Sequence, residues 1–373
     1  MTPPTDPYQA VTHPDPYPYY AELRARGGLH RVPGFGPWIA ADAATVRAVL
    51  TSEHCRVRPL SEPVPPHLVG TAAGSLFGRL VRMNDGGPYP AVKQTLSRAL
   101  PEALCEVEAE SRRQAARLFA TPSLSRLPDA ALQLPVFVLG SLLGFPEDTL
   151  EASVQDVDAY VRSAAGPPAG SEGAARLNER VAACFQSTAR TAFTTRLLEG
   201  HGSEDLRIPN AVGLLTQAYE ATAGLLGSTL RAFAHVPELR EQLSHGACTM
   251  DDVVQEAARH DSPVQNTRRF THAAATIAGQ ALEAGATVVV VLAAANRDPL
   301  ENPQPDAFLP KRARRQSFTF GLGSHACPGP LLATTMAKAA AVRVLASGLD
   351  LSPLSGPVTW RASTNARVLG GLE

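Results

Sequence analysis

Apolar residues recur at three- and four-residue spacing along most of the chain, which is the pattern of amphipathic helices. The segments with this spacing are 21–27, 43–53, 89–120, 131–144, 146–165, 173–200 and 250–261. The run 209–236 is apolar almost all round, so it is predicted to be a central, buried helix. The pattern therefore predicts a mainly helical protein.

Strand patterns are few and short. They occupy 30–41, 267–292 and a weak pair at 358–363 and 366–371. Segments that are rich in proline, glycine and serine, or long and irregular, are predicted to be the loops 61–75, 165–173 and 296–317. We therefore expect one α+β domain over residues 1–373, mainly α with a small β-rich side, and a flexible segment at 1–13.

Composition and charge narrow the class of protein. Hydrophobic residues make up 44% and charged residues 18% of the chain, which is typical of a globular protein. A net charge of -1 gives no general attraction to nucleic acid or anionic lipid. The start has no signal-peptide pattern, and the longest apolar run, 286–295, is too short to span a bilayer and is predicted to be a buried strand. We expect a cytoplasmic protein without nucleic-acid or membrane partners.

The five cysteines argue against a disulfide framework or a structural zinc site, because they are odd in number and form no CxxC pair. Most are interpreted as small buried residues. Cys327 has a different setting, since it lies in FTFGLGSHACPGP, residues 318–330. Gly321 and Gly323 allow the backbone to turn sharply and to approach a ligand closely.

The residues that follow Cys327 predict a helix. Pro328 suits the first helical position, and LLATTMAKAAAVRVLA continues as a good helix. Cys327 is therefore expected at a helix N-terminus, where the dipole and free amides favour a thiolate. The loop alone leaves two interpretations open: a thiolate ligand beside a flat cofactor, or a glycine-rich turn with a cysteine N-cap.

The spacing F-G-x-G-x-H-x-C-x-G resembles the haem-binding loop of the cytochrome P450 family. It is filled here by Phe320, Gly321, Gly323, His325, Cys327 and Gly329. The resemblance implies the fold of that family, with haem b as cofactor, Cys327 as its axial ligand and His325 at a haem propionate. In the family the thiolate favours O–O cleavage. The resemblance runs from about residue 14 to the end and is weakest between about 155 and 208.

Upstream motifs support the same resemblance. Glu256 and Arg259 stand at i and i+3, on one helix face, where an ion pair can form. They look like the family's E-x-x-R helix, which together with Arg312 would hold the proximal side rigid. Arg269 is similar to the strand arginine that reaches a propionate, and Arg268 is the alternative if the register shifts by one residue.

The sequence departs from the family in a segment that usually reads D-P-P-x-H-x-x-x-R. The equivalent here is DGGPYPAVK, which puts Tyr89 and Lys93 at the positions of the propionate-binding histidine and arginine. Lys93 keeps the positive charge, but its ammonium group lacks the two parallel N–H donors of an arginine guanidinium. Tyr89 can donate a hydrogen bond but adds no charge.

A second departure lies in the central helix, where the family's A-G-x-D/E-T-T resembles QAYEAT, residues 217–222. Glu220 occupies the acid position, Ala221 replaces the alcohol that helps to deliver protons, and Thr222 lies about 100° further round the helix. These three are the candidate catalytic positions. Three consequences stay open: a hydroxyl supplied by substrate or an ordered water, peroxide as the oxidant, or a reaction such as oxidative coupling, dehydrogenation or nitrogen oxidation.

Family position also implies where substrate binds. The pocket would be lined by the loop around 61–80, by the central helix and by the start of the strand region. The lining residues there are Leu214, Ala218, Ala221, Val264, Gln265 and Asn266. They are mostly small or apolar, which is consistent with a medium-sized, largely apolar substrate. The expected activity is oxidation of a small to medium organic molecule in secondary-metabolite biosynthesis.

Two further expectations concern partners and rivals. The basic runs KRARR (311–315) and SRR (111–113) suggest a docking surface for an acidic ferredoxin, supplied by its reductase, unless peroxide serves instead. The alternative hypothesis is a peroxide-driven, radical-coupling, dehydrogenating or nitrogen-oxidising haem enzyme. A non-catalytic haem-binding relative would be expected to lack Cys327 or the E-x-x-R pair, and this chain has both.

Overall fold

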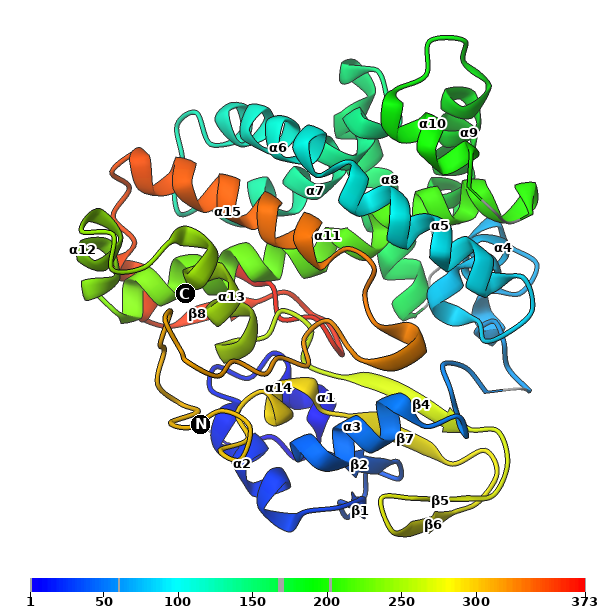
Figure 1. Ribbon diagram of the computed structural model, residues 1–373, viewed down its shortest axis with the longest axis vertical. Coiled ribbons are helices and arrows are strands. Elements are labelled where there is room, and N and C mark those ends of the chain that lie inside the picture. Colours follow the sequence, from blue (N-terminus) through cyan, green and yellow to red (C-terminus); the bar gives the residue numbers. More distant parts are fainter. Residues whose placement is uncertain (1, 60, 167–170, 201–202, 373) are drawn as a thin grey trace.

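The computed structural model describes residues 2–59, 61–166, 171–200 and 203–372. It consists of a large helical part and a smaller part that holds most of the strands (Figure 1). This confirms the expected fold class, mainly α with a small β-rich side. None of the described helices combines the length and apolarity that crossing a bilayer requires.

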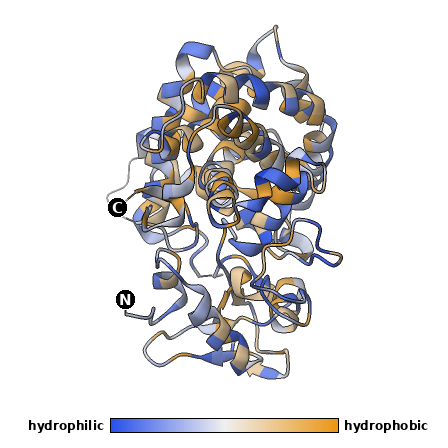
Figure 2. Ribbon diagram, turned by 90° about the vertical axis from the view of Figure 1, so that its left-hand side faces the viewer, coloured by the Kyte–Doolittle hydropathy of each residue, from blue (hydrophilic) through white to orange (hydrophobic). Residues whose placement is uncertain are grey.

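The helical part is centred on α11 (Glu204–His235), which packs against α7 (Leu127–Leu143) and α15 (Pro330–Ala346). The helices around them are α4 (Ala72–Arg79), α5 (Tyr89–Glu102), α6 (Leu104–Leu118), α8 (Leu150–Ala165), α9 (Ser171–Gln186), α10 (Ala192–Leu198), α12 (Glu238–Ser244) and α13 (Met250–His260). The largest hydrophobic cluster runs through these helices, and Figure 2 shows apolar residues concentrated inside the bundle. Burial of this cluster is the main source of stability.

The main sheet has five short strands in the order β1-β2-β7-β4-β3. They are β1 (His30–Arg31), β2 (Trp38–Ala40), β7 (Thr287–Val290), β4 (Thr267–Thr271) and β3 (Cys55–Arg56), with β2 and β7 parallel and the other pairs antiparallel. Two hairpins, β5 (Ala275–Ile277) with β6 (Gln280–Leu282) and β8 (Val358–Trp360) with β9 (Leu369–Leu372), complete the strands. The short helices α1 (Pro7–Ala10), α2 (Tyr17–Arg26), α3 (Ala43–Thr51) and α14 (Leu292–Ala295) lie beside the main sheet (Figure 1).

Several predicted segments are divided in the structure. The predicted helix 89–120 is two helices, α5 and α6, that meet at Ala103, two residues after Pro101 has removed an amide donor. Residues 173–200 likewise contain α9 and α10. The predicted strand 286–295 is β7 followed by the helix α14.

The segment 61–75, which was predicted to be a loop, contains the start of a helix. α4 begins at Ala72, and the Thr71 hydroxyl caps it by accepting the Gly74 amide at 3.0 Å. A side chain at Gly74 would meet the Leu68 carbonyl oxygen at 2.0 Å, so the glycine allows close packing here. Residues 167–170 of the predicted loop 165–173 lie outside the described residues.

The first and last parts of the chain are joined by one side chain. Arg367 donates from Nη1 to the carbonyl oxygens of Val11 and His13, both at 2.8 Å, and from Nη2 to that of Pro14 at 3.0 Å. Ala10 and Val11 are fully buried at this junction. The flexibility expected over 1–13 stays a prediction.

Candidate active site

Backbone hydrogen bonds fold residues 318–329 into a tight loop. The Gly321 amide donates to the Phe318 carbonyl oxygen and the Cys327 amide to that of Phe320, both at 2.8 Å. Gly321 and Gly323 both have positive φ, 68° and 69°, a conformation that side chains disfavour. A Cβ at Gly323 would also lie 2.8 Å from the Leu50 carbonyl oxygen, so this glycine seats the loop against the end of α3.

Cys327 stands just before a helix, as expected, but the helix begins two residues later than predicted. α15 starts at Pro330 with Gly329 as its N-cap residue, so Pro328 is not the first helical residue. The Gly329 amide points at Cys327 Sγ, 3.3 Å away. Burial raises the pKa of the Cys327 thiol, while the Gly329 amide and the charge of Lys93 act to lower it.

The surroundings of Cys327 indicate an internal recess. Cys327 is exposed, yet enough protein surrounds it for burial to be the main influence on the pKa of its thiol. Phe320, Gly321 and Gly329 nearby are half-buried. A thiol that is both accessible and surrounded by protein suits a ligand bound inside the molecule.

The four residues predicted to hold a propionate come from three places in the chain: α5, the cysteine loop and β4. Lys93 on α5 donates to the Ser324 carbonyl oxygen, which brings α5 onto the cysteine loop. Tyr89, at the start of α5, donates to the Gly78 carbonyl oxygen at 3.3 Å. His325 Nε2 lies 2.8 Å from Asp85 Oδ1.

Arg269 on β4 is a buried cation without a carboxylate partner among the described residues. It is 6% exposed, and its guanidinium donates only to the Arg268 carbonyl oxygen at 2.9 Å and to Thr267 Oγ1 at 3.4 Å. Burial lowers the pKa of Arg269, although the charges of Cys55 and Asp85 act against this. An isolated buried cation is costly unless an anion pairs with it, so its setting fits an anionic group of a bound cofactor.

Sequence reasoning missed Asp85, which accepts both from His325 and from the Val57 amide at 3.0 Å. Burial acts to raise the pKa of Asp85, but these two bonds outweigh it and lower the pKa below its usual value. Asp85 is the aspartate of the DGGPYPAVK segment. That segment contained the signal, but only its Tyr89 and Lys93 were interpreted.

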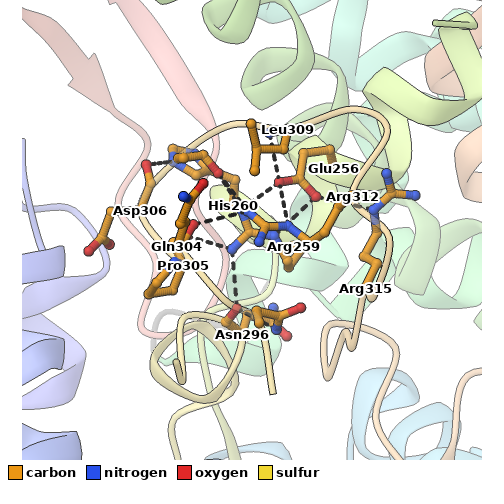
Figure 3. Close-up of polar contacts among 12 residues, drawn as sticks. Glu256, Arg259, His260, Asn296, Gln304, Pro305, Asp306, Leu309, Arg312 and Arg315 are labelled. Atoms are coloured by element: carbon orange, nitrogen blue, oxygen red, sulfur yellow. Dashed lines mark hydrogen bonds and ion pairs between the residues drawn. The ribbon is translucent and has the colours of Figure 1, made fainter. Parts of the chain in front are cut away.

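Glu256 on α13 lies at the centre of a buried ion cluster (Figure 3). Arg259 makes two bonds to the two oxygens of this carboxylate, at 2.6 and 3.1 Å, and both side chains are fully buried. Arg312 Nε donates to the same carboxylate at 3.2 Å, and the Leu309 amide at 3.1 Å. The structure therefore brings together the three residues that the sequence grouped.

A fourth member of this cluster, Arg315, corrects the predicted surface patch. Its Nε lies 3.1 Å from Glu256 Oε2 and its side chain is 16% accessible, so it belongs to the interior (Figure 3). The remaining exposed cations of the run are paired as well: Arg314 with Glu301 at 3.0 Å and Lys311 with Asp252 at 2.9 Å. KRARR is therefore not a uniform exposed basic patch.

The long connection 296–317 is ordered by two asparagines that the sequence analysis did not single out. Asn296 accepts the Phe318 amide at 2.5 Å and donates to Ser262 Oγ at 2.6 Å. Asn302 accepts the Gln316 amide at 2.9 Å. Both are fully buried, and the irregular backbone is thereby fixed on the side of the cysteine loop. Their position at either end of NRDPLEN, residues 296–302, was the available signal.

One face of the central helix α11 is accessible although the positions around it are buried. Leu214, Gln217, Ala218 and Ala221 are half-buried and follow one another at three- and four-residue spacing. Thr222 is fully buried, and its hydroxyl has no hydrogen-bond partner in the described parts of the chain. Ala221, rather than Thr222, therefore lies on the open face.

Glu220 is held beside this face by an arginine from the end of the chain. Arg361, which follows β8, places its Nε 3.4 Å from Glu220 Oε1 and also pairs with Asp158 on α8. Burial raises the pKa of Glu220, while Arg361 acts to lower it. The sequence did not predict Arg361, because a contact across 141 positions leaves no local pattern.

The three predicted pocket residues before β4 differ in their settings. Val264 is half-buried and forms an isolated bridge with Ala366. Gln265 and Asn266 are buried, and their side-chain amides donate to the carbonyl oxygens of Ser262 at 2.6 Å and Thr364 at 2.8 Å. Contact of these residues with substrate stays a prediction.

Residues 248–347 match the family described as Cytochrome P450. The cytochrome P450 monooxygenase PikC of Streptomyces venezuelae is 27% identical over 96% of this chain and 90% of its own length. The beta-dihydromenaquinone-9 omega-hydroxylase of Mycobacterium tuberculosis is 25% identical over 99% of this chain and 77% of its own length. The crystal structure of CalO2 superposes with a TM-score of 0.83 at 23% identity, covering 100% of this chain and 98% of that one.

The cysteine loop, the buried Glu256 cluster and these likenesses define an oxidoreductase of the haem-thiolate class. The chain belongs to the cytochrome P450 family, and it is a P450-type oxidoreductase. Its residues fit such a cofactor: an accessible thiol at a helix start, a buried unpaired cation at Arg269 and an open face on α11.

Proposed function

We propose that this protein binds haem b through Cys327 and oxidises a small to medium organic substrate in secondary-metabolite biosynthesis. The observation that carries the proposal is the accessible Cys327 thiol in its glycine-turned loop before α15. When bound, the haem supplies activation of oxygen, and the thiolate ligand favours O–O cleavage. Catalytic P450 monooxygenases among the bacterial relatives, PikC included, support the reaction class.

The residues around the loop would bind and orient the cofactor. Arg269 and Lys93 would pair with propionates, and His325 would donate from Nδ1 while Asp85 holds its Nε2. Tyr89 would add a neutral donor. Phe320, Gly321, Gly323 and Gly329 shape the loop so that the backbone comes close to the ring. The Glu256 cluster keeps this loop in position and takes no part in the chemistry.

The reduced carbon-monoxide difference spectrum tests the proposal. The wild type should give the red-shifted thiolate band, and Cys327→Ala should lose it. Cys105→Ala, which removes an exposed cysteine on α6, is the matched control and should keep the band. A thiolate band that persists in Cys327→Ala would contradict the assignment.

We further propose that proton delivery at the distal face is atypical. Ala221 offers no hydroxyl on the accessible face, and the Glu220 carboxylate forms an ion pair with Arg361. Substrate or an ordered water would then supply the missing donor. The same observation favours a second candidate, a peroxide-driven or radical-coupling, dehydrogenating or nitrogen-oxidising enzyme, since such reactions need less controlled proton delivery.

Ala221→Thr tests the distal proposal. The new hydroxyl should reduce the hydrogen peroxide released per NADPH oxidised, because protons reach bound oxygen more productively. Thr222→Val, which alters a buried hydroxyl off the open face, should leave this ratio unchanged. Equal peroxide release from the wild type and Ala221→Thr would argue against the role given to position 221.

A ferredoxin and its reductase are proposed as the electron source. Comparing turnover with this pair against turnover with hydrogen peroxide separates the two candidate functions. The monooxygenase proposal expects faster turnover with the ferredoxin system. Turnover with peroxide alone, at a rate that ferredoxin does not raise, would favour the second candidate.

A further inference from the structure

The backbone of Arg82 is fixed against the central helix α11. It lies in the short 3-10 turn Val81–Met83, directly after α4. Asn210 on α11 holds this turn, accepting the Val81 amide at 2.8 Å and donating to the Arg79 carbonyl oxygen at 2.9 Å. Asn210 is buried, so it holds the Cα atom of Arg82 close to the central helix.

The Arg82 guanidinium has no partner in the described parts of the chain. No hydrogen bond or carboxylate within 4.0 Å reaches it there, whereas Glu220 and Asp158 already pair with Arg361. Asp158 also pairs with Arg162 at 2.7 Å. The nearby carboxylates are therefore occupied, and Arg82 is left as an uncompensated positive charge.

The position of Arg82 is internal although the side chain is accessible. The Arg82 side chain is exposed, yet burial by the surrounding protein lowers the pKa of its guanidinium. The groups whose charges reach it are Tyr160 on α8 and Glu220 on α11. The helix α4, which ends just before this turn, packs against both α8 and α11, and these two helices pack against each other. Arg82 therefore lies where the three helices meet.

Tyr160 supplies an independent observation. Its side chain is 1% exposed, and its hydroxyl has no hydrogen-bond partner in the described parts. An unpaired buried hydroxyl is costly, and it marks a position where a ligand can complete the bonding. The charge of Arg82 reaches this hydroxyl. Leu80, two residues before Arg82, packs beside Gly213 of α11, next to the half-buried Leu214.

We propose that Arg82 binds an anionic group, such as a carboxylate, on the substrate, with the Tyr160 hydroxyl as a second donor and the apolar face of α11 against the rest of the molecule. This inference rests on the proposed function, because it names the substrate class of the same site. The substrate would then be an amphipathic acid: a charged end paired with a guanidinium and an apolar body bearing the carbon to be oxidised.

The test is a spectral titration of the haem-loaded protein with two matched probes, dodecanoate and dodecanol. Binding beside the iron shifts the Soret band, so the dissociation constant is measured without turnover. The wild type should bind dodecanoate more tightly than dodecanol. Arg82→Gln should weaken dodecanoate by about tenfold or more, as expected for a charge-assisted hydrogen bond, and leave dodecanol unchanged. Arg82→Lys should be intermediate.

The control is Arg79→Gln, three residues away, whose side chain lines a separate pocket with Glu179 and Asp205. It should leave both dissociation constants unchanged. Equal effects of Arg82→Gln on both probes, or no preference of the wild type for the acid, would overturn the proposal. Loss of haem in Arg82→Gln would assign Arg82 to a propionate instead. Absence of the thiolate band in the wild type would refute the proposed function itself, a result distinct from each of these.

Discussion

At the scale of single residues, Glu256 carries more than a pairwise salt bridge. Three guanidinium groups and one backbone amide converge on its carboxylate, and the carboxylate is fully buried. Burial acts to raise the pKa of Glu256, but the bonds from the arginines and Leu309 lower it below its usual value. Because the group stays ionised, it can neutralise several cations that would otherwise be buried without an anion.

Glu256→Ala should therefore destabilise the protein by about 3–5 kcal/mol, since it leaves buried charges without a partner. Urea unfolding followed by circular dichroism measures this effect. Glu301→Ala, which removes the surface partner of Arg47 and Arg314, should cost only about 0–1 kcal/mol. Similar losses in the two variants would show that the Glu256 cluster is not a major source of stability.

Residue-scale prediction from the sequence succeeded where a short motif carries the signal. The E-x-x-R spacing placed Glu256 and Arg259 together. The loop spacing singled out Cys327 among five cysteines, and its role as a haem ligand stays a prediction. Arg315 was misjudged as a surface charge, because a basic run has the same letters whether its side chains point inward or outward. Arg82 gave no signal at all, since the lack of a partner is visible only in three dimensions.

At the scale of elements, α13 shows how a helix start is stabilised from both directions. The Thr249 hydroxyl accepts the Asp252 amide at 3.2 Å, and Asp252 in turn accepts the Thr249 amide at 2.8 Å. This capping box satisfies two amides that the helix itself leaves unpaired. The capping box sets the residue at which α13 begins, and so fixes the position of Glu256 along the helix.

Asp252→Asn tests the charge at this cap through its pH dependence. Burial acts to raise the pKa of Asp252, but its bonds with Thr249 and Lys311 outweigh this and lower the pKa to about 2. A lowered folded-state pKa means that the carboxylate stabilises the protein above its ordinary pKa of 3.8 and loses this effect as the pH falls towards 2.

The wild type should therefore be more stable than Asp252→Asn at pH 7, and the difference should shrink as the pH falls from 3.8 towards about 2. Urea unfolding at a series of pH values measures it. Asp251→Asn, which leaves the capping box intact, is the matched control. A difference that is constant with pH would show that the charge of Asp252 does not matter to α13.

Element boundaries were less predictable than element types. The runs with three- and four-residue apolar spacing were correctly predicted to be helices. The break between α5 and α6 and the start of α4 depend on contacts that the local pattern lacks. Gly74, for example, resembles a loop residue by type. In the structure it lets α4 approach the Leu68 carbonyl oxygen, which no residue with a side chain would allow.

At the scale of the whole molecule, the two parts of the fold meet around the cysteine loop. The helical part supplies α11 and α15, and the smaller part supplies α3 and β4 (Figure 1). The overall fold class followed from the sequence because helical periodicity covers most of the chain. Contacts such as that of Arg361 with Glu220 could not be predicted, since they join residues that are distant in sequence.

Arg367→Ala tests another contact between segments that are distant in sequence. Removing its three bonds to residues 11–14 should speed hydrogen–deuterium exchange of amides in 6–14 by about ten- to a hundredfold, given the usual strength of charged hydrogen bonds. The Soret band should stay unchanged. Arg343→Ala, which removes an exposed hydrogen bond to the Ala120 carbonyl oxygen, is the control. Unaltered exchange in 6–14 would show that other contacts hold this segment.

The same arginine has a consequence for the order in which the protein is completed during synthesis. The ribosome adds residues 11–14 to the chain 353 to 356 positions before it adds Arg367, so these residues cannot form their final contacts until Arg367 has been synthesised. The smaller part therefore cannot complete its folding as soon as its own early segments have been synthesised. A side chain that is synthesised much later completes the packing of a segment that was synthesised early.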